Sequence, residues 1–220
     1  MIINADILAE KFEKAWRMCF ESIKVSVRNT AGLDENNARQ FANEVVHPFR
    51  KRILSLDTEV FEWIESKIGF PLPMPLREIF AEIDLAKTVV WNTHFSLEEL
   101  TSSNVPEDQR YLYGVVEQSL DNFKTLNRIP KNWLTLGFIG EDWIAFDLAS
   151  SEWPLVCFDP DGRELCRAAR DLSEYLSLCA DLTIAQYADS PISGESIQAF
   201  LRDLPKGVVT DKWLRRYVPH

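Results

Sequence analysis

The stretch WLTLGFIGEDWIAFDLASSEWPLVCFD, residues 133–159, decides the fold. It contains three short apolar runs, at 133–139, 143–148 and 154–159, which are rich in the aromatic and β-branched residues that favour strands. The segments between the runs are too short for a crossover helix, so neighbouring strands have to run antiparallel. The stretch therefore predicts a three-stranded β-meander.

The middle run gives this meander two different faces. Successive side chains of a strand point to opposite sides of the sheet. One side receives Ile144, Phe146 and Leu148, and the other receives Trp143, Ala145 and Asp147. The first set is typical of a core, whereas the second places an aromatic ring and a carboxylate together on the opposite face.

Helical spacing of apolar residues dominates the chain before the meander. Residues 1–56 predict two helices, the second of them interrupted near Pro48. Asp57 is a suitable N-cap for a third helix, which Gly69 can end. The three prolines of FPLPMP, residues 70–75, then force an extended connection into a fourth helix.

The remaining segments alternate between the two patterns. KTVVWNTHF, residues 87–95, predicts one strand, and SLEEL, residues 96–100, predicts a short helix capped by Ser96. Helical spacing returns at 109–126 and, after the meander, at 163–182. The last part of the chain predicts a helix from about Glu195 to Asp203, followed by an irregular tail.

These elements combine several helices with an antiparallel meander. Hydrophobic residues make up 46% of the 220 residues, which is enough for a real core. We expect residues 1–56 to form an N-terminal helical extension packed on the body, which residues 57–220 form.

The formal net charge of −10 is unevenly distributed: residues 1–56 carry +2 and residues 57–220 carry −12. An acidic body repels nucleic acid and anionic lipid and attracts basic proteins. No apolar run approaches the ~20 residues that span a bilayer, and the first residues lack the apolar core of a signal peptide. The four cysteines include no CxxC pair. We therefore expect a cytoplasmic protein that binds neither nucleic acid nor membrane. Its acidity favours a basic protein partner, and the alternative is that the charge only keeps the protein soluble.

The segment FDPDGRE, residues 158–164, raises the question of catalysis. Asp159 and Asp161 superficially resemble the phosphotransfer loop of haloacid-dehalogenase-type phosphatases. Arg163 and the antiparallel strands before it argue against that reading, while the proline and glycine beside the aspartates favour a turn. The three histidines are scattered, and the common nucleophile, zinc and phosphate-loop motifs are missing. We therefore expect no catalytic residue, no metal and no cofactor.

Residues 141–164 hold seven acidic side chains and one basic one, Arg163. In a meander these carboxylates gather at strand ends beside two tryptophans, and aromatic anchors surrounded by acid suit a basic protein surface. The candidate partner-binding residues are Glu141, Asp142, Trp143, Asp147, Glu152, Trp153, Asp159 and Asp161. The alternative is that the carboxylates only keep the turns and a sheet edge soluble.

The order of these features resembles the SUKH superfamily, which unites fungal cell-wall synthesis regulators with bacterial toxin-immunity proteins. The resemblance covers about residues 57–180. It starts with a helix and a G…LP…L…F pattern, continues through IP, a glycine-containing strand, an acidic turn and an aspartate-bearing strand, and ends with a final helix. The matching residues are Gly69, Leu72, Pro73, Leu76, Phe80, Ile129, Pro130, Gly137, Gly140, Asp142, Asp147, Val156, Phe158, Leu172, Tyr175 and Leu176.

This resemblance implies that residues 57–220 form an α+β domain without catalytic activity. Its central sheet, antiparallel or mixed, would contain the meander and be flanked by helices. Bacterial members commonly neutralise a cognate toxin by direct binding, and the toxin is often a nuclease delivered between competing cells. The resemblance therefore implies an immunity protein whose partner is a basic, nuclease-like toxin. It leaves open a second function, that of a non-catalytic regulatory scaffold of the fungal cell-wall regulator type.

Overall fold

The computed structural model describes residues 4–46, 50–51, 54–85, 89–91, 93–95, 112–116, 130, 132–188, 195–204 and 211–218. The helices are α1 (Ala5–Ala31), α2 (Glu35–Val45), α3 (Glu59–Ile68), α4 (Met74–Glu82), α6 (Leu172–Gln186), α7 (Glu195–Asp203) and α8 (Asp211–Tyr217), with a further helical segment at 112–116. The strands are β1 (Arg50–Lys51), β2 (Ile83–Asp84), β3 (Val89–Val90), β4 (Thr93–His94), β5 (Trp133–Ile139), β6 (Asp142–Asp147), β7 (Leu155–Phe158) and β8 (Glu164–Ala169). The fold is α+β, as predicted.

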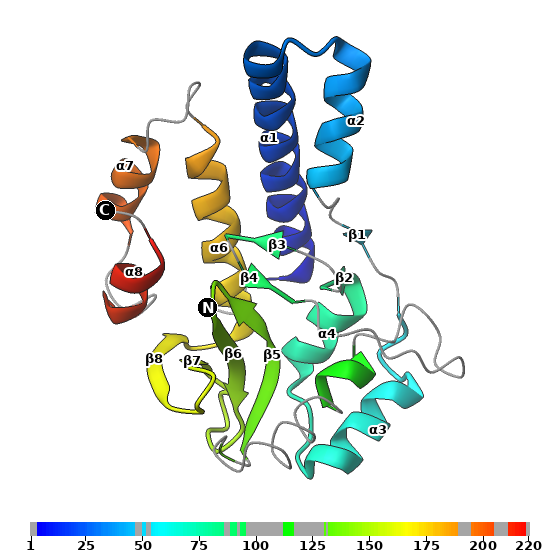
Figure 1. Ribbon diagram of the computed structural model, residues 1–220. Helices are drawn as coiled ribbons and strands as arrows, with labels where there is room; N and C mark the ends of the chain where they lie inside the picture. The colour runs from blue at the N-terminus through cyan, green and yellow to red at the C-terminus, as the bar shows by residue number, and fades with distance from the viewer. Residues whose placement is uncertain are drawn as a thin grey trace.

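The predicted meander is confirmed and forms the centre of a larger sheet (Figure 1). In the described residues this sheet has six strands in the order β3-β4-β5-β6-β7-β8, and every neighbouring pair is antiparallel. A second, two-stranded sheet pairs β1 with β2. The longest pairing joins β5 to β6 and contains an irregularity between Thr135 and Gly137.

The two predicted faces of β6 are also confirmed. Ile144, Phe146 and Leu148 belong to the main hydrophobic core, together with residues of α1, α3, α4, α6 and α8. Ala145 belongs to a second, smaller apolar cluster, against which Trp143 packs. The sheet therefore has a core face and an opposite face, which we call the outer face.

Helix α6 is the centre of the helical layer. In Figure 1 it lies between α1 on one side and α7 on the other, in agreement with the contacts that these helices make. Leu8, Phe12 and Ala15 of α1 enter the main core, and Lys11 of α1 forms an ion pair of 2.6 Å with Asp181 of α6. Helix α1 begins at the N-cap Asn4 and ends at Gly32, whose φ of 64° lies in the left-handed region. Among the described helices, none is long and apolar enough to cross a bilayer.

The prediction of one long helix at 163–182 was wrong in its first part. Residues 164–169 form β8, the last strand of the sheet, and α6 begins only at Leu172. Asp171 separates the two elements because its side chain accepts a hydrogen bond from the backbone N–H of Glu174 and so caps the helix. The alternation of exposed and buried residues along β8 matches a strand at the edge of a sheet.

Three smaller predictions need correction. The single strand expected at 87–95 is the hairpin β3–β4, which turns at Trp91, where φ is 49°. The N-cap of α3 is Thr58, one residue after the expected Asp57. The tail, expected to be irregular, contains α8. The expected interruption at Pro48, the helix at 96–100 and most of the helix at 109–126 lie outside the described residues.

Candidate protein-binding surface

The outer face of the meander carries a row of aromatic side chains. The ring of Phe158 lies 5.1 Å from that of Trp133 and 6.4 Å from that of Trp143, centroid to centroid, and the second pair is stacked. Phe138 meets Trp143 edge to face at 6.5 Å. Phe158 and Trp133 are buried within this row, whereas Phe138 and Trp143 remain half-buried. The row therefore presents part of two rings to the outside.

One end of this face holds three of the predicted acidic residues. Because Trp143 pairs with Phe158, the start of β6 and the end of β7 lie together. Glu141, Asp159 and Asp161 are therefore neighbours at this end, and Glu141 and Asp161 are exposed. Asp159 is half-buried and makes a local ion pair with Arg163, whose Nη2 lies 2.8 Å from Oδ2.

The contact with Arg163 also fixes the charge of Asp159. The backbone N–H of Arg163 donates to Oδ1 at 2.9 Å and the side-chain Nε donates to Oδ2 at 3.0 Å. These bonds favour the ionised carboxylate and lower the pKa of Asp159, the backbone bond most of all. The FDPDGRE segment is thus a turn held by Asp159, with Gly162 at a φ of 80°.

Asp142, at the same end, faces inward. Its carboxylate is buried and accepts hydrogen bonds from Nε of Arg216 at 2.7 Å and from the hydroxyl of Tyr217 at 2.8 Å. Both partners belong to α8, and the ion pair raises the pKa of the Arg216 guanidinium. The structure therefore uses Asp142 to hold the last helix.

The remaining predicted residues lie at the opposite end of the meander. Asp147 is half-buried at the end of β6, where it accepts from Nδ2 of Asn132 at 2.6 Å and from the backbone N–H of Ala149 at 3.1 Å. Glu152 is exposed in the connection to β7. Trp153 is buried and packs on Phe146, centroids 5.7 Å apart. The eight predicted residues are thus divided between two ends of the sheet.

Glu152 and Trp153 border a cavity of about 360 Å³ that the sequence did not reveal. Residues of α4, of the β6–β7 connection and of the start of α6 line it. Its apolar wall consists of Pro73, Pro75, Leu76, Ile79, Trp153 and Leu172, and its polar wall consists of Ser151, Glu152, Arg170, Asp171 and Ser173.

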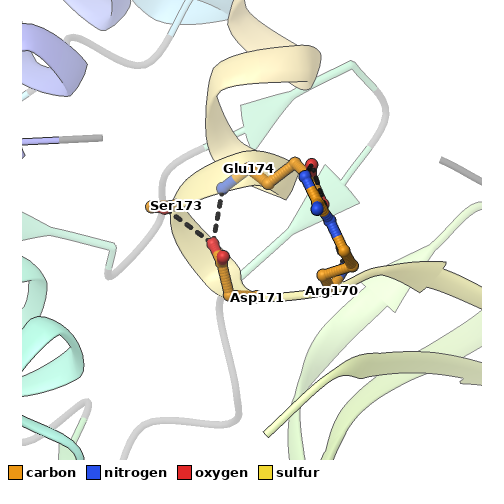
Figure 2. A network of polar contacts seen from close by, with 4 residues as sticks. All are labelled: Arg170, Asp171, Ser173 and Glu174. Carbon is orange, nitrogen blue, oxygen red and sulfur yellow. Dashed lines mark hydrogen bonds and ion pairs between the residues drawn. The ribbon is translucent and has the colours of Figure 1, made fainter. Parts of the chain in front are cut away.

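Figure 2 shows the polar network at this wall. Oδ1 of Asp171 accepts from the backbone N–H of Glu174 at 2.8 Å and from the hydroxyl of Ser173 at 2.6 Å. The guanidinium of Arg170 lies against the buried carboxylate of Glu174, with Nε 3.2 Å from Oε2. This ion pair raises the pKa of Arg170. The network fixes the start of α6 and keeps charged groups at the rim of the cavity.

A metal site is not among these features. In the described parts of the chain no group of three or more histidine, cysteine, aspartate or glutamate side chains is placed to hold a metal ion. Asp159, Asp142 and Glu174 each form an ion pair with an arginine. The partners are Arg163, Arg216 and Arg170, respectively.

Of three comparisons with known proteins, the one with protein families gave a match. Neither the curated proteins nor the solved structures gave a significant match. The SMI1 / KNR4 family (SUKH-1) matches residues 55–178, which is more than half of the chain and includes α3, α4 and the whole meander. Helices α1, α2, α7 and α8 lie outside the match. The chain belongs to the SMI1 / KNR4 family (SUKH-1).

Proposed function

We propose that this protein is an immunity protein that binds and neutralises a cognate bacterial toxin. The toxin would be a basic, nuclease-type effector of interbacterial competition, and the protein would act by occupying it without catalysis. Family membership supports a protein-interaction domain. We also propose that the protein meets this basic toxin in the cytoplasm.

The observation that carries the proposal is the half-buried Trp143 on the outer face, stacked on the buried Phe158. Aromatic side chains that are fixed by their neighbours are favourable anchors at protein interfaces because little conformational entropy is lost on binding. Exposed Glu141 and Asp161 lie at one end of the aromatic row, and half-buried Asp147 and exposed Glu152 lie at the other. A nuclease must neutralise phosphates, so its substrate-binding surface is cationic and complementary to such a face.

The proposal is tested with the product of the gene next to the one that encodes this protein. Both proteins are purified, and their affinity is measured by calorimetry at two salt concentrations. The double variant Glu141→Lys, Asp161→Lys should weaken the complex by about 10- to 100-fold, because two attractive contacts become repulsive. The loss should shrink at high salt, where exposed charges are screened.

A matched control changes the same number of charges elsewhere. Glu10→Lys and Glu44→Lys lie at exposed positions of α1 and α2. This double variant should bind as the wild-type protein does. If it loses affinity while the Glu141 and Asp161 variant does not, the binding surface lies on the N-terminal helices and the outer face is excluded.

The regulatory scaffold function makes a different prediction. Such a protein should bind no toxin encoded beside it, and co-expression should not protect cells from that toxin. A protection assay with the paired genes therefore separates the two functions independently of the surface that is used.

A further inference from the structure

Two cysteines face each other across the last two strands of the sheet. Cys157 of β7 and Cys166 of β8 are direct partners in the antiparallel register. Their exposed fractions are 0% and 4%, and both side chains belong to the main hydrophobic core. Register irregularities on both sides of the pair, at Leu155/Val156 and at Cys157/Phe158, bend the strands around it.

This placement suits a disulfide. Residues directly opposite each other in an antiparallel pair have Cα atoms about 4.5 or 5.5 Å apart, depending on the type of pair. Both values lie within the roughly 4.4–6.8 Å found between disulfide-bonded Cα atoms. Because the two residues are direct partners and both enter the same core, their side chains lie on the same face of the sheet. Closing the bond therefore requires little movement of the backbone.

The two thiols have unequal surroundings. The interaction with Cys157 is the largest cause that lowers the pKa of the Cys166 thiol, and the positive charges of Lys212 and Arg216 of α8 lower it further. The same interaction and burial raise the pKa of Cys157. Asp142, which opposes the ionisation of both thiols, holds Arg216 and Tyr217 in place. Since α8 packs against β8, which carries Cys166, and Cys166 is the more exposed of the two thiols, it is the better nucleophile of the pair.

We propose that Cys157 and Cys166 form a redox-active dithiol that closes into a cross-strand disulfide when it meets a hydroperoxide. The Cys166 thiolate attacks the terminal oxygen, the O–O bond breaks, and the alkoxide or hydroxide that leaves takes up a proton. The sulfur of Cys157 then attacks the sulfur of the Cys166 sulfenic acid and forms the S–S bond. The S–O bond breaks, and the departing hydroxide takes the proton of the Cys157 thiol and leaves as water. Two electrons pass from the two thiols to the peroxide, and a reducing thiol reverses the change.

The other two cysteines are poorly placed for this reaction. Burial raises the pKa of the Cys179 thiol to about 12 and also raises the pKa of Cys19. Cys19 contacts Tyr187, and Cys179 contacts Tyr175 and Thr93. The proposal therefore predicts oxidation at one pair and protection of the remaining two thiols.

The test uses the full chain and hydrogen peroxide. Trypsin cleaves after Arg163 and Arg167, so the two cysteines fall into different peptides. After a brief treatment, a non-reducing digest should contain the peptides 132–163 and 164–167 joined by a disulfide, and dithiothreitol should separate them. Sulfinic acid on Cys166 without linkage, a disulfide that involves Cys19 or Cys179, or unreacted thiols under conditions that oxidise the unfolded chain would each overturn the proposal.

A second measurement examines the role of α8. Lys212→Gln and Arg215→Gln remove the same charge from exposed positions of the helix, but only Lys212 acts on Cys166. At neutral pH, Lys212→Gln should slow disulfide formation several-fold, because the thiolate fraction falls. Arg215→Gln should react at the wild-type rate. Equal rates in the two variants would show that the helix does not activate Cys166.

Discussion

The hydroxyl of Tyr217 donates a hydrogen bond of 2.8 Å to Oδ2 of Asp142, a residue 75 positions earlier in the chain. The bond joins the last described helix to the first residue of the central strand, and Nε of Arg216 reaches the same oxygen. Asp142 lies inside the region matched by the family, whereas α8 lies outside it. An acidic residue inside the matched region thus holds a helix that lies outside it.

Asp142→Ala should therefore destabilise the protein. The change removes the hydrogen bonds that the buried carboxylate accepts from Arg216 and Tyr217. The partly buried hydroxyl of Tyr217 then loses its bond to Asp142. We expect a loss of about 1–3 kcal/mol in the free energy of unfolding, measured by urea denaturation. Glu141→Ala is the matched control, since Glu141 is the exposed neighbour and its replacement should cost less than about 0.5 kcal/mol. Equal losses in both variants would contradict the anchoring role.

A second polar contact is completely enclosed in the core. The hydroxyls of Thr93 in β4 and Tyr175 in α6 lie 2.7 Å apart, and both residues have exposed fractions of 0%. Tyr175→Phe should reduce the free energy of unfolding by about 1 kcal/mol, because a buried hydroxyl loses a partner. The double variant Tyr175→Phe, Thr93→Val should lose less than the sum of the single variants. Additive losses in this cycle would show that the two hydroxyls do not interact.

The three strands of the meander were predictable from the sequence, whereas the neighbouring strand β8 was not. Local alternation in β6 separates Ile144 and Phe146 from Trp143 and Ala145, so one strand was enough to assign two faces. The sequence of β8 wrongly predicts a helix because its small apolar residues continue directly into the helical pattern of α6, with no proline or glycine between them. The boundary depends on the cap at Asp171, a single side-chain hydrogen bond.

The candidate site also depends on contacts that local sequence does not encode. Charge and strand position predict eight binding residues, but they do not distinguish an exposed carboxylate from a buried one. Asp142 becomes an anchor because α8 reaches it, and Trp153 becomes part of a cavity wall because residues of α4 and of the start of α6 line the same cavity. Both outcomes depend on contacts between residues far apart in the sequence, which no local pattern encodes.

The turn after β7 should respond to acid. The pKa of Asp159 is lowered in the folded protein, so the contribution of this carboxylate to stability is complete above the usual aspartate range and is lost as the pH falls through the lowered pKa. An NMR titration should give Asp159 a pKa below that of an ordinary aspartate. In the variant Arg163→Ala, the pKa of Asp159 should rise only part of the way to its ordinary value. The backbone N–H of residue 163, whose hydrogen bond lowers this pKa most, is retained. A complete return would mean that the guanidinium alone sets the pKa.

The aromatic row on the outer face separates stability from binding. Phe158 is enclosed between Trp133 and Trp143, so Phe158→Ala should cost about 3–5 kcal/mol in the free energy of unfolding. Trp143 keeps one part of its ring accessible, and Trp143→Ala should cost clearly less than Phe158→Ala in the same denaturation experiment.

If the outer face binds a partner, Trp143→Ala should also weaken the complex by about 2 kcal/mol or more, because the anchor is lost. Trp143→Phe retains an aromatic ring and should recover part of that affinity, whereas full affinity in Trp143→Ala would exclude this ring from the interface.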